Sequence, residues 1–101
     1  LHLAKMAREA GASGVVASPR DIAALRRALG DDFLIVTPGI RASDEKVADD
    51  QKRTLSAFEA ISAGADYIVV GRPIRKARDP LEACRRIIRE IADGLEARNR
   101  A

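Results

Sequence analysis

Two arginines and one glutamine carry the chemistry that the sequence predicts, which is the binding of a phosphate group. Arg72 follows Gly71 directly after a short apolar run, and a glycine there lets a ligand approach the backbone closely. Arg41 ends a second apolar segment, and Gln51 lies in the polar stretch behind it. A guanidinium group offers a planar fork of donors that matches phosphate oxygens. An isolated Gly-Arg pair is more often a solvated loop, so the prediction depends on whether the chain gathers these residues.

The elements that must position these residues are short strands, each followed by a helix. We expect strands near 14–17, 34–37 and 67–70, because each is an apolar, β-branched run bounded by turn residues, and we expect the last of these to be buried. Crossover connections make such strands parallel, so their carboxyl ends share one edge. Ligands bind at that edge in barrels and in open sheets, which would bring Arg41 and Arg72 together around one anion.

Local signals predict where the helices begin and end. The chain opens inside a helix, without an N-cap, and we therefore expect an upstream portion to be missing. Ser18-Pro19-Arg20-Asp21 should form a capping box, and Asp79-Pro80-Leu81-Glu82 should repeat that start for the longest helix. Another helix is expected to begin near Thr54, and the tail from Glu96 to Ala101 is expected to fray.

The pattern Ala-Gly-Ala before a strand occurs twice, at 10–16 and at 63–70, which indicates an array of βα units. Three such units preceded by a helix amount to less than half of an eight-unit barrel, although an open sheet has the same pattern. The longest helix should bury one apolar face, formed by Cys84, Ile87, Ile88, Ile91 and Leu95.

Composition limits the possible functions. The chain has 101 residues, 47% of them hydrophobic and only three aromatic, which is typical of an α/β domain with an aliphatic core. The formal net charge is only +3, because basic and acidic residues are mixed along the chain, and we therefore expect no nucleic-acid partner. One cysteine allows no internal disulfide, and no apolar stretch is long enough to span a membrane, so we expect a soluble cytoplasmic protein. His2 is the only histidine, which excludes a His-based triad or metal site.

Three blocks of the sequence resemble the carboxyl-terminal part of orotidine 5'-phosphate decarboxylase. They are Thr37-Pro38-Gly39-Ile40-Arg41, Asp50-Gln51-Lys52-Arg53 and the stretch from Ala63 to Ile74, which includes Gly71-Arg72-Pro73. The blocks have the order and spacing of that family, and 14–18 fits its sixth strand. One departure follows Arg41, where many relatives continue with Pro-x-Gly and this chain has Ala42-Ser43-Asp44-Glu45.

The resemblance implies the carboxyl-terminal portion of a (β/α)₈ TIM barrel that works as a homodimer. It implies conversion of orotidine 5'-monophosphate to uridine 5'-monophosphate and CO₂ without a metal or organic cofactor. By motif position, Arg41, Gln51, Gly71 and Arg72 would bind the substrate, chiefly its phosphate, and Pro38 would lie near the pyrimidine.

The family's proton donor lies in an Asp-x-Lys-x-x-Asp motif on an early strand, and we expect that segment to be lacking here. Lys46, Lys52 and Lys76 do not follow a predicted strand within that pattern, so we predict no catalytic residue in this chain and no activity of the chain alone. Two alternatives remain. One is another sugar-phosphate barrel enzyme with the same Gly-Arg turn, and the other is an isolated partial barrel that serves as a folding or binding module.

Overall fold

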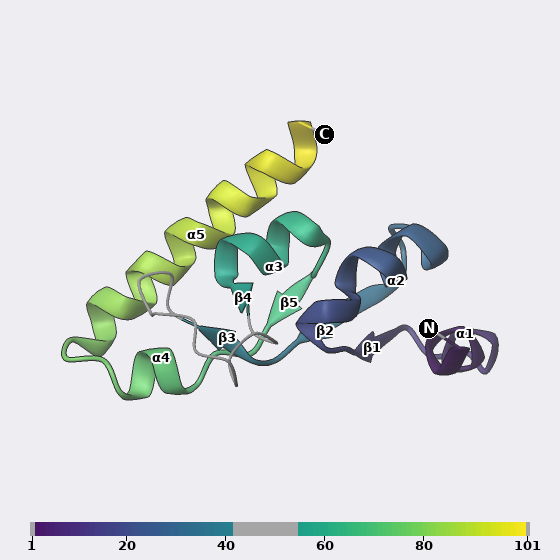
Figure 1. Ribbon diagram of the computed structural model, residues 1–101, viewed down its shortest axis with the longest axis horizontal. Coiled ribbons are helices and arrows are strands. Elements are labelled where there is room, and N and C mark those ends of the chain that lie inside the picture. The colour runs from purple at the N-terminus through teal and green to yellow at the C-terminus, as the bar shows by residue number, and fades with distance from the viewer. Residues whose placement is uncertain (1, 42–54, 101) are drawn as a thin grey trace.

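A computed structural model describes residues 2–41 and 55–100, which form five helices, five short strands and one 3-10 turn (Figure 1). In chain order these are α1 (His2–Glu9), β1 (Gly14–Val16), a 3-10 turn (Pro19–Asp21), α2 (Ile22–Leu29), β2 (Leu34–Thr37), β3 (Ile40–Arg41), β4 (Leu55–Ser56), α3 (Ala57–Ala63), β5 (Tyr67–Ile68), α4 (Arg72–Arg75) and α5 (Pro80–Arg100).

The main sheet is parallel, as the crossover argument predicts. Its strand order is β1-β2-β5, with Val16 paired to Val36 and Val36 paired to Tyr67. All three expected strands are present, but β1 and β5 are shorter than predicted. The pairing of β5 continues through one further hydrogen bond, from the Val69 N–H to the Thr37 carbonyl at 3.0 Å. A second parallel pair, β3 with β4, was not predicted.

The two faces of the sheet have different surroundings. Ile35 and Thr37 are fully buried on the face that the helices cover, where Ile35 contributes to the apolar core. On the opposite face Val16 and Tyr67 are 74% and 60% exposed. The strand at 67–70 is therefore not buried as predicted, because β5 is an edge strand and the described residues cover only one of its faces.

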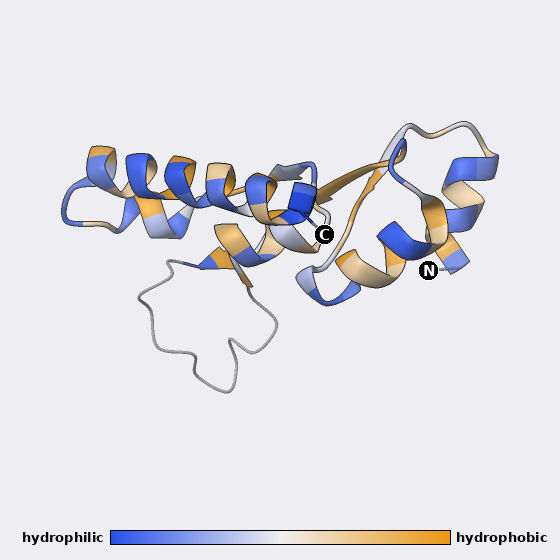
Figure 2. Ribbon diagram, turned by 90° about the horizontal axis from the view of Figure 1, so that it is seen from above, coloured by the Kyte–Doolittle hydropathy of each residue, from blue (hydrophilic) through white to orange (hydrophobic). Residues whose placement is uncertain are grey.

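Helices α3 and α5 make the most extensive contact between elements (Figure 1). Gly94 of α5 allows it: a Cβ atom there would lie 3.0 Å from both the Ile61 Cβ and the Phe58 carbonyl oxygen. The coloured ribbon in Figure 2 shows apolar segments alternating with polar ones along α5. Its apolar face is only partly covered, since Ile87 is buried whereas Ile88 and Leu95 are exposed, contrary to the prediction.

Three predicted helix boundaries need correction. Ser18 is an N-cap, but its hydroxyl accepts from the Arg20 N–H and the turn that follows is 3-10, so no capping box forms with Asp21. Helix α3 begins at Ala57 rather than near Thr54, behind a capping box made by Ser56 and Glu59.

Helix α5 does not fray after Glu96 but continues to Arg100. Arg98 holds this last part, because its Nη1 donates to the Ala65 carbonyl at 3.0 Å. The start of α5 agrees with the prediction, since Asp79 accepts from the Glu82 N–H. Within the described ranges, no helix is both long and apolar enough to cross a membrane.

The internal repeat is visible in the hydrogen bonds that end α1 and α3. The Gly11 N–H donates to Arg8 and the Ala12 N–H to Ala7, and Gly64 and Ala65 repeat both bonds with Ile61 and Ala60. Both glycines have positive φ, at 98° and 128°, which an L side chain adopts only with strain. The repeated sequence therefore encodes one helix-ending turn used twice.

Candidate phosphate-binding site

The loops after the parallel strands meet at their carboxyl edge, as expected. A Cβ atom at Gly39, behind β2, would lie 3.9 Å from the Pro19 Cγ behind β1, so these two loops lie close together. Helix α4, which begins at Arg72, lies beside β3, which ends at Arg41 (Figure 1). The elements that carry the two predicted phosphate-binding arginines are therefore neighbours.

Gly71 and Arg72 form the start of α4 and are both exposed. Gly71 has φ −114°, which any residue adopts, and a Cβ atom there would meet no atom within 4 Å among the described residues. The fold itself therefore does not require a glycine at this position. The open space fits the expectation that a ligand approaches the backbone here.

A cleft of about 510 Å³ separates α4 from the first half of α5, and Arg72 lies at its wall. The other charged residues that line it are mixed in sign: Lys76, Arg78 and Arg86 with Asp79, Glu82 and Glu90. The excess of positive charge is small. Arg72 is thus the residue that connects this cleft with the carboxyl edge of the sheet.

Arg41 is held more firmly than Arg72. Its side chain is 15% exposed, and its Nη2 lies 3.0 Å from Glu59 Oε1. The same carboxylate oxygen accepts the Ser56 N–H at 2.9 Å within the capping box of α3. A guanidinium has five N–H donors, so a contact to Glu59 is compatible with further donors facing a ligand.

The structure describes Pro38, another predicted site residue, but not Gln51. Pro38 is exposed in the turn behind β2, where Gly39 adopts φ 78°. Gln51 lies outside the described residues, so its role stays a prediction. Thr37, directly before Pro38, is fully buried, and its Oγ1 has no hydrogen-bond partner among the described residues.

The letters Asp-x-Lys-x-x-Asp do occur in this chain, at Asp44-Glu45-Lys46-Val47-Ala48-Asp49, which corrects the expectation that the pattern is missing. This stretch comes after Arg41, whereas the motif implied by the resemblance precedes the phosphate-binding blocks. The stretch also lies outside the described residues. We therefore assign it no catalytic role. Within the described parts of the chain, no group of three or more acidic, histidine or cysteine residues could hold a metal ion.

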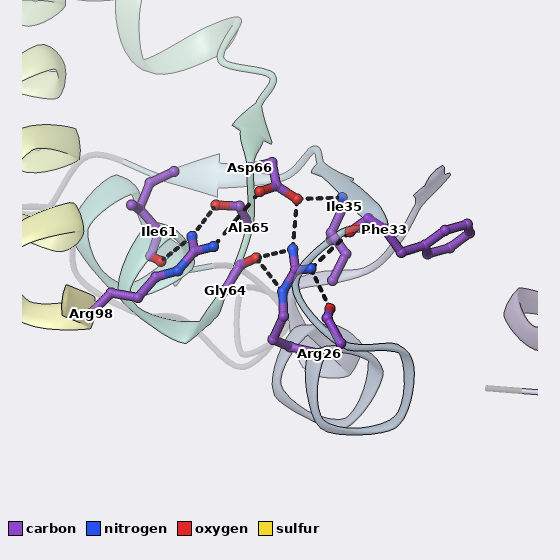
Figure 3. A network of polar contacts seen from close by, with 9 residues as sticks. Arg26, Phe33, Ile35, Ile61, Gly64, Ala65, Asp66 and Arg98 are labelled. Carbon is purple, nitrogen blue, oxygen red and sulfur yellow. Dashed lines mark hydrogen bonds and ion pairs between the residues drawn. The ribbon is translucent and has the colours of Figure 1, made fainter. Parts of the chain in front are cut away.

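A second polar cluster, which was not predicted from the sequence, lies at the opposite, amino edge of the strands (Figure 3). Arg26 Nη2 lies 2.6 Å from Asp66 Oδ2 and also donates to the Gly64 carbonyl. Asp66 in turn accepts the Ile35 N–H at 2.8 Å, and Arg98 approaches its other oxygen at 3.7 Å. This cluster joins α2, β2, β5 and α5 far from the candidate site, so its role is structural.

Some of the residues that were not predicted had a local signal in the sequence, and others had none. Ser56-Ala57-Phe58-Glu59 has the Ser-x-x-Glu spacing of a capping box, and that signal could have placed the start of α3. Arg26 and Asp66 are 40 residues apart in sequence, and no local pattern connects them. Only the packing of α2 against the end of α3 reveals that pair.

Comparison with known proteins agrees with the resemblance. The family model "Orotidine 5'-phosphate decarboxylase / HUMPS family" matches residues 1–87. Proteins named orotidine 5'-phosphate decarboxylase from Syntrophus aciditrophicus and Trichlorobacter lovleyi are 58% identical over 98 residues and 56% identical over 96 residues. These alignments cover 97% and 95% of this chain and 39% of each relative, so the chain spans about two fifths of their length.

Solved structures show the same likeness in three dimensions. The orotidine 5'-phosphate decarboxylase from Lactobacillus acidophilus superposes with a TM-score of 0.72 at 42% identity, covering 89% of this chain and 35% of that one. The enzyme from Pyrococcus horikoshii OT3 gives 0.68 at 35% identity, with 90% and 40% covered. These relatives are TIM barrels, and the described βα units are a portion of that fold. The chain belongs to the orotidine 5'-phosphate decarboxylase / HUMPS family.

Proposed function

We propose that this chain forms the phosphate-binding side of an orotidine 5'-phosphate decarboxylase, an enzyme that converts orotidine 5'-monophosphate to uridine 5'-monophosphate and CO₂. The observation that carries the proposal is the adjacency of β3 and α4, which puts Arg41 and Arg72 on neighbouring elements at the carboxyl edge of the sheet. Family membership and the names of relatives that are more than half identical support the choice of substrate.

In this proposal each site residue has a separate task. Arg72 contributes a charge-assisted fork to the phosphate, and Arg41 contributes donors from the neighbouring strand. Gln51 adds an amide, Gly71 leaves room for the phosphate at the backbone, and Pro38 lies near the pyrimidine. The exposure of Arg72 and the open space beside Gly71 support these assignments.

Binding a phosphate that takes no part in the reaction still contributes to the rate. Contacts to a remote group supply free energy that organises the reacting centre and holds the site closed over the substrate. The proton donor comes from outside this chain, on a strand of the complete barrel. The complete enzyme acts as a cytoplasmic homodimer without a metal or organic cofactor, which is what the family resemblance supports.

Two preparations test the proposal. The full-length protein that contains this chain should release CO₂ from orotidine 5'-monophosphate, whereas the 101-residue chain of confirmed intact mass should not exceed the uncatalysed rate. Full-length protein without this activity would contradict the proposed function and favour a different sugar-phosphate enzyme.

If the short chain turns over the substrate, the proton donor has been misplaced. In that case Lys46 is the first residue to replace, because it stands in the Asp44 to Asp49 stretch. A Lys46→Ala chain that lost the activity would then move the catalytic role into this segment, and one that kept it would exclude Lys46.

A further inference from the structure

The capping box of α3 does more than start the helix, because its carboxylate also contacts a predicted phosphate-binding residue. Glu59 Oε1 accepts from the Ser56 N–H at 2.9 Å and from Arg41 Nη2 at 3.0 Å. One oxygen thus serves the cap and the arginine at the same time. The Ser56 hydroxyl completes the box by accepting the Glu59 N–H at 3.2 Å.

The elements on both sides of this contact are fixed relative to each other. Strands β3 and β4 pair in parallel with Arg41 opposite Ser56, so the arginine lies beside the residue that caps α3. Glu59 therefore reaches Arg41 from a helix that begins immediately after the paired strand. A carboxylate held by a cap and a strand partner has little freedom, and it restricts the arginine that it binds.

The electrostatic attraction between Arg41 and Glu59 contributes little to the stability of the fold. The Glu59 side chain is 46% exposed, and ion pairs at such positions contribute only about 0 to 1 kcal/mol to stability. Arg41 itself is only 15% exposed, and the strand that carries it contacts α4, the helix that begins at Arg72. The pair is thus better suited to orienting a group than to stabilising the fold.

We infer that Glu59 is a positioning residue that holds the Arg41 guanidinium in place for the substrate phosphate. The inference rests on the proposed function, since it needs a phosphate at the carboxyl edge. The alternative role predicts the opposite effect on binding. If the Glu59 carboxylate competed with the phosphate for Arg41, it would weaken phosphate binding, and its removal would strengthen it. The direction of the effect therefore decides between the two.

Glu59→Gln in the full-length protein separates orientation from capping. Glutamine can still accept the Ser56 N–H at this position of a capping box, but it loses the charge that faces Arg41. The value of kcat/KM for orotidine 5'-monophosphate should fall about tenfold, mainly through KM, by analogy with the loss seen when a group that orients a metal-ligating side chain is removed. Turnover of orotidine, the nucleoside without phosphate, should not change. In an Arg41→Ala background Glu59→Gln should have no further effect.

Ser56→Ala is the matched control, because it weakens the cap and leaves the carboxylate beside Arg41. It should lower the melting temperature and leave kcat/KM for both substrates unchanged. Tighter or unchanged nucleotide binding by Glu59→Gln, or an equal loss on the nucleoside, would overturn the inference. If the wild-type protein shows no decarboxylation, the proposed function fails. Titration of the same five proteins with uridine 5'-monophosphate (wild type, Glu59→Gln, Arg41→Ala, their double variant and Ser56→Ala) then decides the role of Glu59. A wild-type protein that does not bind this nucleotide overturns both.

Discussion

Arg26→Ala should strongly lower the free energy of unfolding and leave kcat/KM per folded molecule unchanged. The Arg26 guanidinium donates to the carbonyls of Gly30, Phe33 and Gly64 and to the carboxylate of Asp66, and its side chain is only 12% exposed. Water can replace the donor at Gly30, which is exposed, but Phe33 and Gly64 are buried.

The expected loss follows from these contacts. Removing one partner of a largely buried ion pair costs about 3 to 5 kcal/mol, because the remaining charge loses its compensation. Asp66 would keep the Ile35 N–H at 2.8 Å and the more distant Arg98, which places the loss toward the lower end of that range. Arg26→Lys keeps the charge but not the planar fork, so it should recover only part of the stability.

Urea unfolding of the full-length protein measures the change as a shift of the midpoint at constant slope. Arg27→Ala is the matched control: Arg27 is the next residue of α2 and is exposed, and its side chain makes no hydrogen bond or ion pair with the described residues. It should change the free energy of unfolding by no more than about 0.5 kcal/mol. Equal losses for the two variants would refute the structural role of the Arg26 cluster. A drop in kcat/KM per folded molecule for Arg26→Ala would show that the two edges of the sheet are coupled.

Further predictions concern the site, the glycines and the open sheet face. Arg72→Ala should cost about 2 to 5 kcal/mol in kcat/KM for the nucleotide and nothing for the nucleoside, with Gln51→Ala costing about 1 kcal/mol; equal losses on both substrates would mean that Arg72 only supports the fold. Gly94→Ala should destabilise by about 1 to 3 kcal/mol, because its Cβ would meet α3, whereas Gly71→Ala should leave stability nearly unchanged in thermal melts. The isolated chain should self-associate in sedimentation, since Val16 and other apolar residues are exposed on the open face, and a stable monomer would contradict this.

Much of the fold could be read from local patterns. Turn residues bound each strand. Gly30 and Gly64 end α2 and α3, as predicted, and their N–H groups donate to carbonyls of the last helical turn. Asp79 caps α5, also as predicted. One predicted boundary failed because two local signals compete there. Ser18-Pro19 fits both a capping box and a 3-10 turn, and the structure has the turn.

The candidate site was predicted only as a set of residues sharing one edge. That Arg41 and Arg72 lie on adjacent elements agrees with the rule for parallel strands. The short pair of β3 with β4 and the contact from Arg41 to Glu59 were not predictable, because each depends on where the chain returns after the stretch from 42 to 54.

By itself, the sequence determined the local elements of this protein, because helix caps, helix-ending glycines and apolar runs act over a few neighbouring residues. The tertiary structure decided which of those residues meet. It put Tyr67 on an open edge, placed Glu59 beside Arg41, and joined Arg26 to Asp66 across 40 residues. These outcomes depend on how helices pack against the sheet and on which face remains uncovered, and that is a property of distant segments together rather than of any one stretch of chain.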